Sequence, residues 1–132
     1  MRSLACAALL GLSLEADACG YCVEDKVAAV YDHASVMQAI AKRQMVVFFA
    51  IDGPMRESRL RLQAIAESVP GVEKGSGRAS LEGASLAIAF DPRRASLAAV
   101  QRVLGQKLRP LGLSLLVLKT MDRPAEFAAG GR

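Results

Sequence analysis

The chain has 132 residues, a length that fits one compact domain. Its longest apolar run, residues 4–14, is about half of the roughly 20 residues that a helix needs to cross a bilayer, so a membrane-embedded bundle is excluded. The formal net charge is +4, but the basic residues are scattered and only 5% of the residues are aromatic, so no nucleic-acid groove is expected.

Residues 1–18 have the layout of a secretory signal peptide. Arg2 precedes the apolar run, and Ala16-Asp17-Ala18 supplies small residues at A-x-A spacing after it. We expect cleavage after Ala18 and export to the periplasm. The residues before Cys19 depart from the bacterial lipoprotein motif, which favours export without a lipid anchor. Cys6 leaves with the leader.

Residues 19–43 are predicted to be a helical segment that carries a Cys-x-x-Cys motif, Cys19 and Cys22. The part from Val23 onward is rich in alanine and contains neither Gly nor Pro, and so long a loop would be rare in a compact domain. We expect this part to be helical, with a break near Asp32.

After this segment, strand and helix patterns alternate. MVVFFAI at residues 45–51 is a continuous apolar run rich in β-branched and aromatic residues, which predicts a buried strand. Apolar residues recur at helical spacing over residues 57–69 and stop at a Pro-Gly pair, which predicts an amphipathic helix. Residues 72–81 give a weaker, glycine-bearing strand signal.

The second half of this region repeats the alternation. Residues 85–90 have the period of a strand and follow a Glu-Gly turn. Ser96 can cap a helix with a regular apolar stripe, and LSLLVL at residues 113–118 predicts the last strand.

The resulting order, β-α-β-β-α-β, is that of a ferredoxin-like α+β fold. We therefore expect residues 44–120 to form a four-stranded antiparallel sheet with two helices on one face. The other face is expected to be exposed, and residues 121–132 are expected to be a flexible tail.

Residues 45–118 resemble the heavy-metal-associated domain of copper chaperones and of the cytosolic arms of metal-pumping ATPases. The resemblance rests on FFAIDG before the first helix, SVPGV at its end, LAIAFDP at the close of the third strand and a short Ser-capped helix after it. It implies a ferredoxin-like fold that binds a soft metal ion through a Gly-Met-x-Cys-x-x-Cys loop.

This chain departs from the family at that loop, which reads GPMRESR. Arg56 and Arg59 stand where the family has its cysteines, and a guanidinium that stays protonated does not ligate a metal. The Cys-x-x-Cys pair lies near the expected mature N-terminus instead. Either the chelating pair has moved there, with the N-terminal arm folding back over the domain, or the domain has lost metal binding and is an interaction module.

Cys19 and Cys22 suit a soft ion such as Cu(I), which two or three soft ligands satisfy. His33 is the candidate third ligand. A single straight helix would separate it from Cys22 by about 16 Å, so it joins the site only if the chain turns back between them.

Thiol-disulfide exchange is the enzymatic alternative, because Cys-Gly-Tyr-Cys is similar to the active-site tetrapeptide of some periplasmic disulfide isomerases. A helix N-terminus favours the thiolate. Two features argue against thiol-disulfide exchange. No strand precedes the motif, and the negative charges of Glu24 and Asp25 would disfavour a thiolate. A plain disulfide is the third possibility, although closing so short a loop stabilises little.

No other constellation in the sequence suggests an enzyme. The sequence thus predicts an exported soft-metal binding protein, with copper the expected ion, held by Cys19, Cys22 and, if the chain turns back, His33. It would sequester the ion or pass it to a metal-donor or metal-acceptor protein by thiolate exchange.

Overall fold

The computed structural model describes residues 22–122. The predicted signal peptide, Cys19 and nearly all of the predicted tail lie outside the described residues. No helix of the described part is long and apolar enough to cross a membrane. The described elements are α1 (Val23–Val30), α2 (His33–Ala41), β1 (Met45–Asp52), α3 (Arg59–Glu67), β2 (Arg78–Ser80), β3 (Ser85–Phe90), α4 (Leu97–Leu108), the 3-10 turn η2 (Arg109–Leu111) and β4 (Ser114–Met121).

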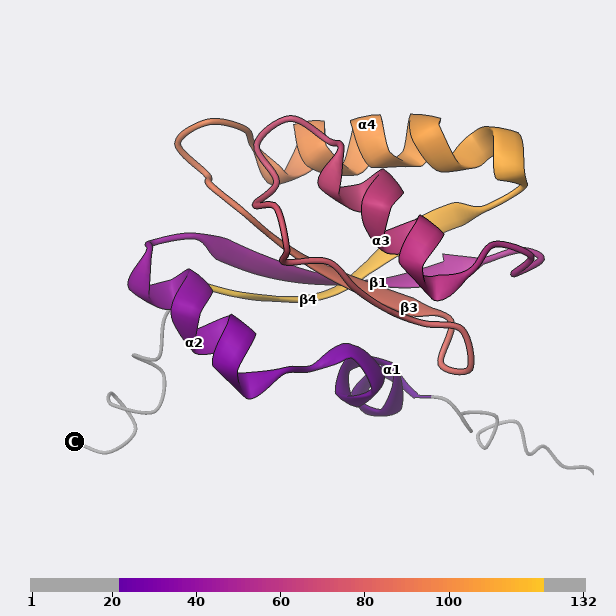
Figure 1. Ribbon diagram of the computed structural model, residues 1–132, viewed down its shortest axis with the longest axis horizontal. Helices are drawn as coiled ribbons and strands as arrows, with labels where there is room; N and C mark the ends of the chain where they lie inside the picture. Colours follow the sequence, from indigo (N-terminus) through magenta and orange to yellow (C-terminus); the bar gives the residue numbers. More distant parts are fainter. Residues whose placement is uncertain (1–21, 123–132) are drawn as a thin grey trace, which may run out of the picture.

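The four strands form one antiparallel sheet in the order β2-β3-β1-β4 (Figure 1). β1 is central and pairs with β3 on one side and β4 on the other, for example Val47 opposite both Ile88 and Thr120. With α3 and α4 as the two connecting helices, this is the expected ferredoxin-like α+β fold.

The main core lies between the sheet and the α3-α4 layer. Val47 and Phe49 of β1 are completely buried there, against Leu62 of α3 and Leu104 of α4. Both helices begin at a serine that caps them: the hydroxyl of Ser58 and that of Ser96 each accept a backbone N-H from the first helical turn.

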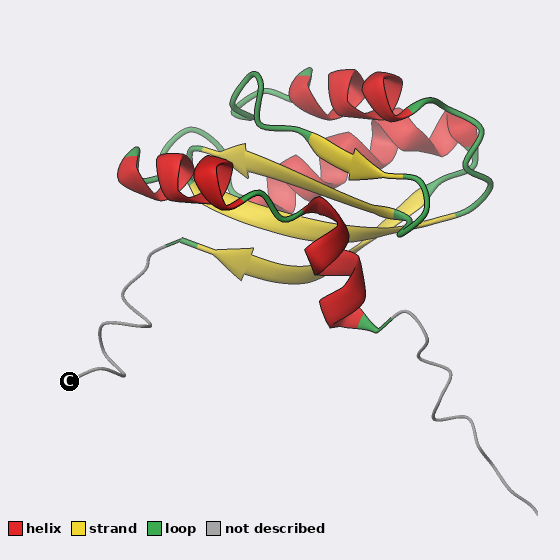
Figure 2. Ribbon diagram, turned by 60° about the horizontal axis from the view of Figure 1, so that its bottom comes forward, coloured by secondary structure: helices red, strands yellow, loops and turns green. Residues whose placement is uncertain are grey.

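The prediction of an exposed second sheet face is wrong, because α1 and α2 fold back over it (Figure 2). Alternate residues of β1 and β3 point to this side and are apolar, so burying them from water stabilises the fold. The helices cover them with valines and an alanine. This second core consists of Val27, Val30, Val36, Ala39, Val46, Phe48, Ala87 and Ala89.

Most predicted elements match the structure, including the break near Asp32, which is the N-cap residue of α2. Of residues 72–81, where the sequence gives a weak strand signal, only Arg78–Ser80 form a strand, β2. Most of that stretch is loop, and it passes through Gly75 at a φ of 85°. In the last strand the structure continues three residues further than predicted, to Met121.

Candidate functional site: a thiol and an apolar groove at the start of α1

Cys22 is the N-cap residue of α1, and its backbone is extended. Its carbonyl accepts the backbone N-H groups of Asp25 and Lys26, at 3.0 and 3.1 Å. The side chain makes no cap hydrogen bond and is exposed, and the thiol donates to Asp25 Oδ2 at 3.5 Å. Local helix geometry therefore holds the backbone of Cys22 while its sulfur stays accessible.

Helix α1 is anchored to the turn between β2 and β3. Lys26 Nζ donates to the carbonyl of Gly83 at 2.8 Å. Gly83 also packs so closely on α1 that a Cβ there would lie 2.9 Å from the Cβ of Ala29. These contacts fix the position of Cys22 relative to the sheet.

An open groove of about 690 Å³ runs between α1 and the edge strand β4. Most of its wall is apolar, and Glu24 and Lys119 are its two charged side chains. Tyr31, at the far end of α1, stacks on Phe48 with ring centroids 6.4 Å apart. The Cys22 thiol thus stands beside a surface that can accept an apolar group. The lining residues are Cys22, Val23, Glu24, Val27, Ala28, Tyr31 and Lys119.

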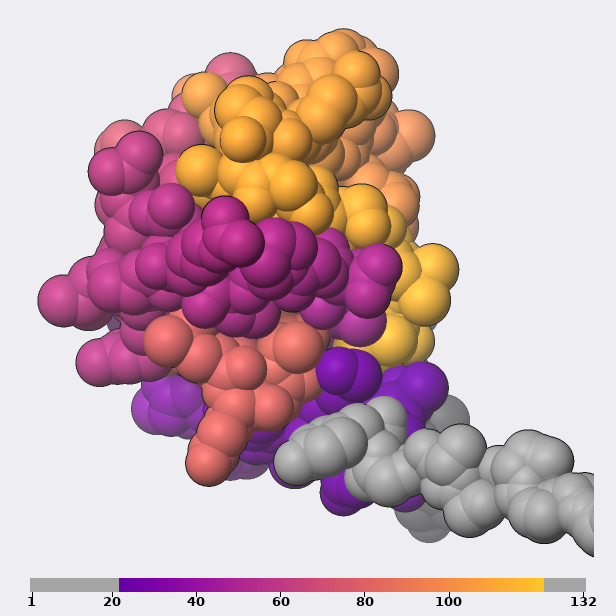
Figure 3. Space-filling model, turned by 90° about the vertical axis from the view of Figure 1, so that its right-hand side faces the viewer, coloured from indigo at the N-terminus to yellow at the C-terminus, as the bar shows by residue number. Residues whose placement is uncertain are grey.

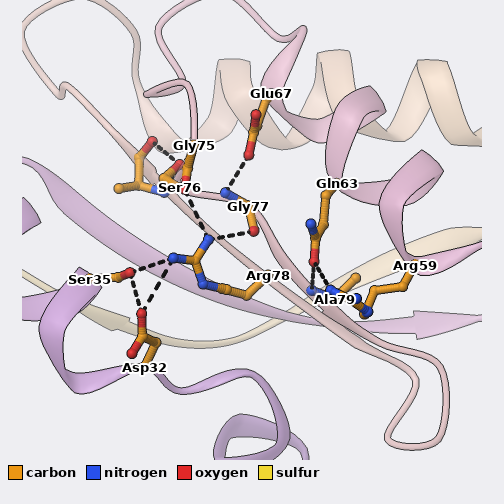
Figure 4. Close-up of polar contacts among 11 residues, drawn as sticks. Asp32, Ser35, Arg59, Gln63, Glu67, Gly75, Ser76, Gly77, Arg78 and Ala79 are labelled. Carbon is orange, nitrogen blue, oxygen red and sulfur yellow. Dashed lines mark hydrogen bonds and ion pairs between the residues drawn. The ribbon is translucent and has the colours of Figure 1, made fainter.

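A second anchor joins the start of α2 to β2 and the loop before it (Figure 4). Arg78 donates through Nη2 to Ser35 Oγ at 2.7 Å and to Asp32 Oδ2 at 3.3 Å. Its Nη1 donates to the carbonyls of Gly75 and Gly77, at 2.9 and 2.8 Å. We call these five residues the Arg78 cluster. Because four of the five guanidinium donors are used internally, the cluster is a fastening rather than a ligand site.

The Arg78 cluster predicts a pH-dependent stability. The hydrogen bond from Ser35, and then Arg78, hold the pKa of the Asp32 carboxyl below its ordinary value of 3.8, although burial opposes them. The stabilisation is complete above the unfolded pKa and is lost as the pH falls through the folded one. We expect Asp32→Asn to lower the urea midpoint near neutral pH, and this deficit to shrink at about pH 3. A deficit that is constant with pH would contradict the ion pair as its cause.

The predicted ligands are only partly brought together. His33 begins α2, and its Nδ1 lies 3.1 Å from the hydroxyl of Tyr31. Cys22 and Tyr31 flank the eight residues of α1, about 13 Å apart along the axis, so the helix separates His33 from the thiol. Within residues 22–122, no group of three or more His, Cys, Asp or Glu side chains is placed to hold a metal ion. The described part therefore supplies one thiol, and the second would come from Cys19.

The segment at residues 53–59 joins β1 to the start of α3. Arg56 and Arg59 are exposed, and Arg59 donates to Gln63 Oε1 at 3.3 Å. Met55 packs against the main core. These residues leave no soft ligand free in the loop.

The sequence did not reveal the groove. Tyr31 and Lys119 are far apart in the sequence, and both line the groove because α1 crosses the sheet toward β4. The one local feature that could have pointed to the groove is Lys119, a cation that directly follows the apolar run of the last strand.

No protein-family model, curated protein or solved structure matches this chain. The fold assignment accordingly rests on the strand order and the helical connections, and the function must be argued from Cys22 and its surroundings.

Proposed function

We propose that Cys19 and Cys22 form a thiolate clamp for a soft metal ion, with Cu(I) the expected ion, and that the ion is a substrate passed to or from a partner protein. The observation that carries the proposal is the exposed Cys22 thiol at the N-terminal end of a helix that is fixed to the sheet. Cys19 lies three residues before it in the sequence. With the Cys22 thiol accessible, a pair at this spacing would permit ligand exchange with an incoming thiolate.

The donor set fits a soft ion better than a hard one. Thiolates select Cu(I), whereas the carboxylates next to Cys22, Glu24 and Asp25, suit hard cations. Binding requires that the thiol proton, which now points to Asp25, leaves. His33 is left out of the proposed ligand set because α1 lies between it and Cys22.

The proposal includes a divergent relationship to the heavy-metal-associated family, in which the clamp has moved from the loop at residues 53–59 to the N-terminal arm. The ferredoxin-like strand order supports the relationship. The packing of α1 and α2 against the domain supports the move, since it makes the arm part of the folded unit. Export through the leader at residues 1–18 belongs to the same proposal.

Thiol-disulfide exchange is the second candidate, and the groove favours it. A thiolate of the pair would attack a substrate disulfide, form a mixed disulfide and release the other substrate sulfur as a thiol. The second cysteine would then close the Cys19-Cys22 disulfide and release the reduced substrate. The apolar groove of about 690 Å³ beside Cys22 could hold the substrate chain during these steps.

The test of the main proposal is an anaerobic titration of the reduced protein with Cu(I) against a competing chelator. We expect one tightly bound ion per chain in the wild type and in His33→Ala, and loss of tight binding in Cys19→Ser/Cys22→Ser. His33→Ala is the matched control because it removes the other soft-ligand candidate. Equal binding by the double-cysteine variant would refute the clamp. Catalysed reduction of a disulfide substrate, with no copper binding, would favour the second candidate.

A further inference from the structure

One end of the α3-α4 layer carries an unbalanced positive charge. Residues 52–61 and 105–112 contain five cations and only two carboxylates, Asp52 and Glu57. The two segments touch, because a Cβ at Gly53 would lie 2.3 Å from the carbonyl oxygen of Gly112. Figure 3 faces this end, with the magenta loop and start of α3 against the orange end of α4. We call it the basic end: Arg56, Arg59, Arg61, Lys107 and Arg109.

The cations of the basic end are not paired with acids. Three cations elsewhere in the described residues make ion pairs with carboxylates: Lys42 with Glu73, Arg78 with Asp32 and Arg93 with Asp91. Within the described residues, the cations of the basic end have no ion pair, and only Arg59 uses its side chain in a hydrogen bond, to neutral Gln63. Their charge is therefore available to an outside anion.

An apolar side chain stands among these arginines. Leu60 is 66% exposed, the largest exposure among the large hydrophobic residues of the described part. An apolar anchor surrounded by arginine is typical of protein interfaces, in which arginine is enriched and lysine depleted. Four of the five cations here are arginines.

The surroundings argue against two other anionic partners. A helix that binds a membrane surface presents a wide apolar face, but α3 turns its apolar residues Leu62 and Ala66 into the core. Single-stranded nucleic acid needs aromatic side chains on which bases can stack, and residues 52–61 and 105–112 contain none.

We infer that the basic end is a docking surface for an acidic protein segment that inserts an apolar side chain beside Leu60. The surface belongs to the α3-α4 side of the sheet, whereas Cys22 belongs to the α1-α2 side. The inference goes beyond the proposed function and does not depend on metal binding.

The test uses the full chain and a fluorescent peptide rich in Glu and Asp with a central leucine, followed by anisotropy at low salt. We expect Arg56→Glu/Arg61→Glu to weaken binding about tenfold or more, since steering by local charge changes association on that scale. Arg43→Glu/Lys74→Glu is the matched control. It changes the net charge equally, and both of its residues are exposed and outside the basic end. Leu60→Ser should also weaken binding, without a change of charge.

Equal weakening by the two charge-reversal pairs would overturn the inference, because net charge alone would then explain binding. Unaltered binding by Leu60→Ser would overturn the apolar contact. Preference for phosphatidylglycerol vesicles over the peptide, lost in Arg56→Glu/Arg61→Glu, would replace the protein partner with a membrane. Cys19→Ser/Cys22→Ser should bind the peptide as the wild type does, so the outcome is separate from that of the copper titration.

Discussion

We expect Phe48→Ala to lower the free energy of unfolding by about 3–5 kcal/mol, the usual cost of removing a buried phenyl ring. Phe48 is fully buried in the second core, where α1 and α2 cover the sheet, and its ring also supports Tyr31 in the groove. The loss should appear in urea unfolding monitored by circular dichroism.

Phe49→Ala is the matched control, because Phe49 is equally buried but faces the α3-α4 side. Both variants should lose similar stability. Only Phe48→Ala should raise native-state amide exchange in α1 and α2 selectively, since those helices lose their contact with the sheet. Equal exchange in α1 and α2 for the two variants would contradict the division into two cores.

We expect Gly53→Ala to cost about 3 kcal/mol, from an unfavourable backbone conformation and a steric clash together. Gly53 has a φ of 126°, and its added Cβ would lie 2.3 Å from the carbonyl oxygen of Gly112 and 3.0 Å from Leu113 Cδ2. Backbone cannot move aside as a flexible side chain does, so the turn after β1 and the segment between η2 and β4 must separate.

Gly75→Ala provides the comparison. Gly75 also has a positive φ, 85°, but nothing lies within 4 Å of its added Cβ. It should therefore cost only about 1–2 kcal/mol, the conformational part. Thermal or urea unfolding of both variants separates the two contributions, and an equal loss would show that the contact between Gly53 and Gly112 is unimportant.

The ferredoxin-like unit could be predicted because its signals are local. The run at residues 45–51, the alternation at residues 85–90 and the serine before α4 each specify an element without knowledge of the rest. β2 was poorly defined, because a strand of three residues carries too little pattern to outweigh the glycines of the preceding loop.

The cover on the second sheet face could not be predicted in the same way. The spacing of apolar residues in α1 and α2 indicates that each helix buries one face. It does not indicate which surface of the protein that face packs against. A signal was present in β3, where alanines occupy the positions between large apolar residues, so that both faces of the strand are apolar.

For the candidate site, the motif identified Cys22 but not its surroundings. Glu24 and Asp25, which the sequence places close to the motif, lie in the first turn of α1. The groove depends on the meeting of α1 and β4, which are far apart in sequence. His33 is left out of the proposed ligand set because α1 is long enough to separate it from Cys22. The sequence could not show this, because the expected break near Asp32 allowed the chain to turn back toward the cysteine.

The most direct test of the proposed clamp is X-ray absorption spectroscopy of the copper-loaded, reduced protein. It reports the ligands around the ion itself. The account predicts Cu(I) coordinated by two sulfur atoms in the wild type, with the same spectrum in His33→Ala and no ordered copper signal in Cys19→Ser/Cys22→Ser. Copper bound through nitrogen and oxygen ligands, or a wild-type spectrum in the double-cysteine variant, would contradict it.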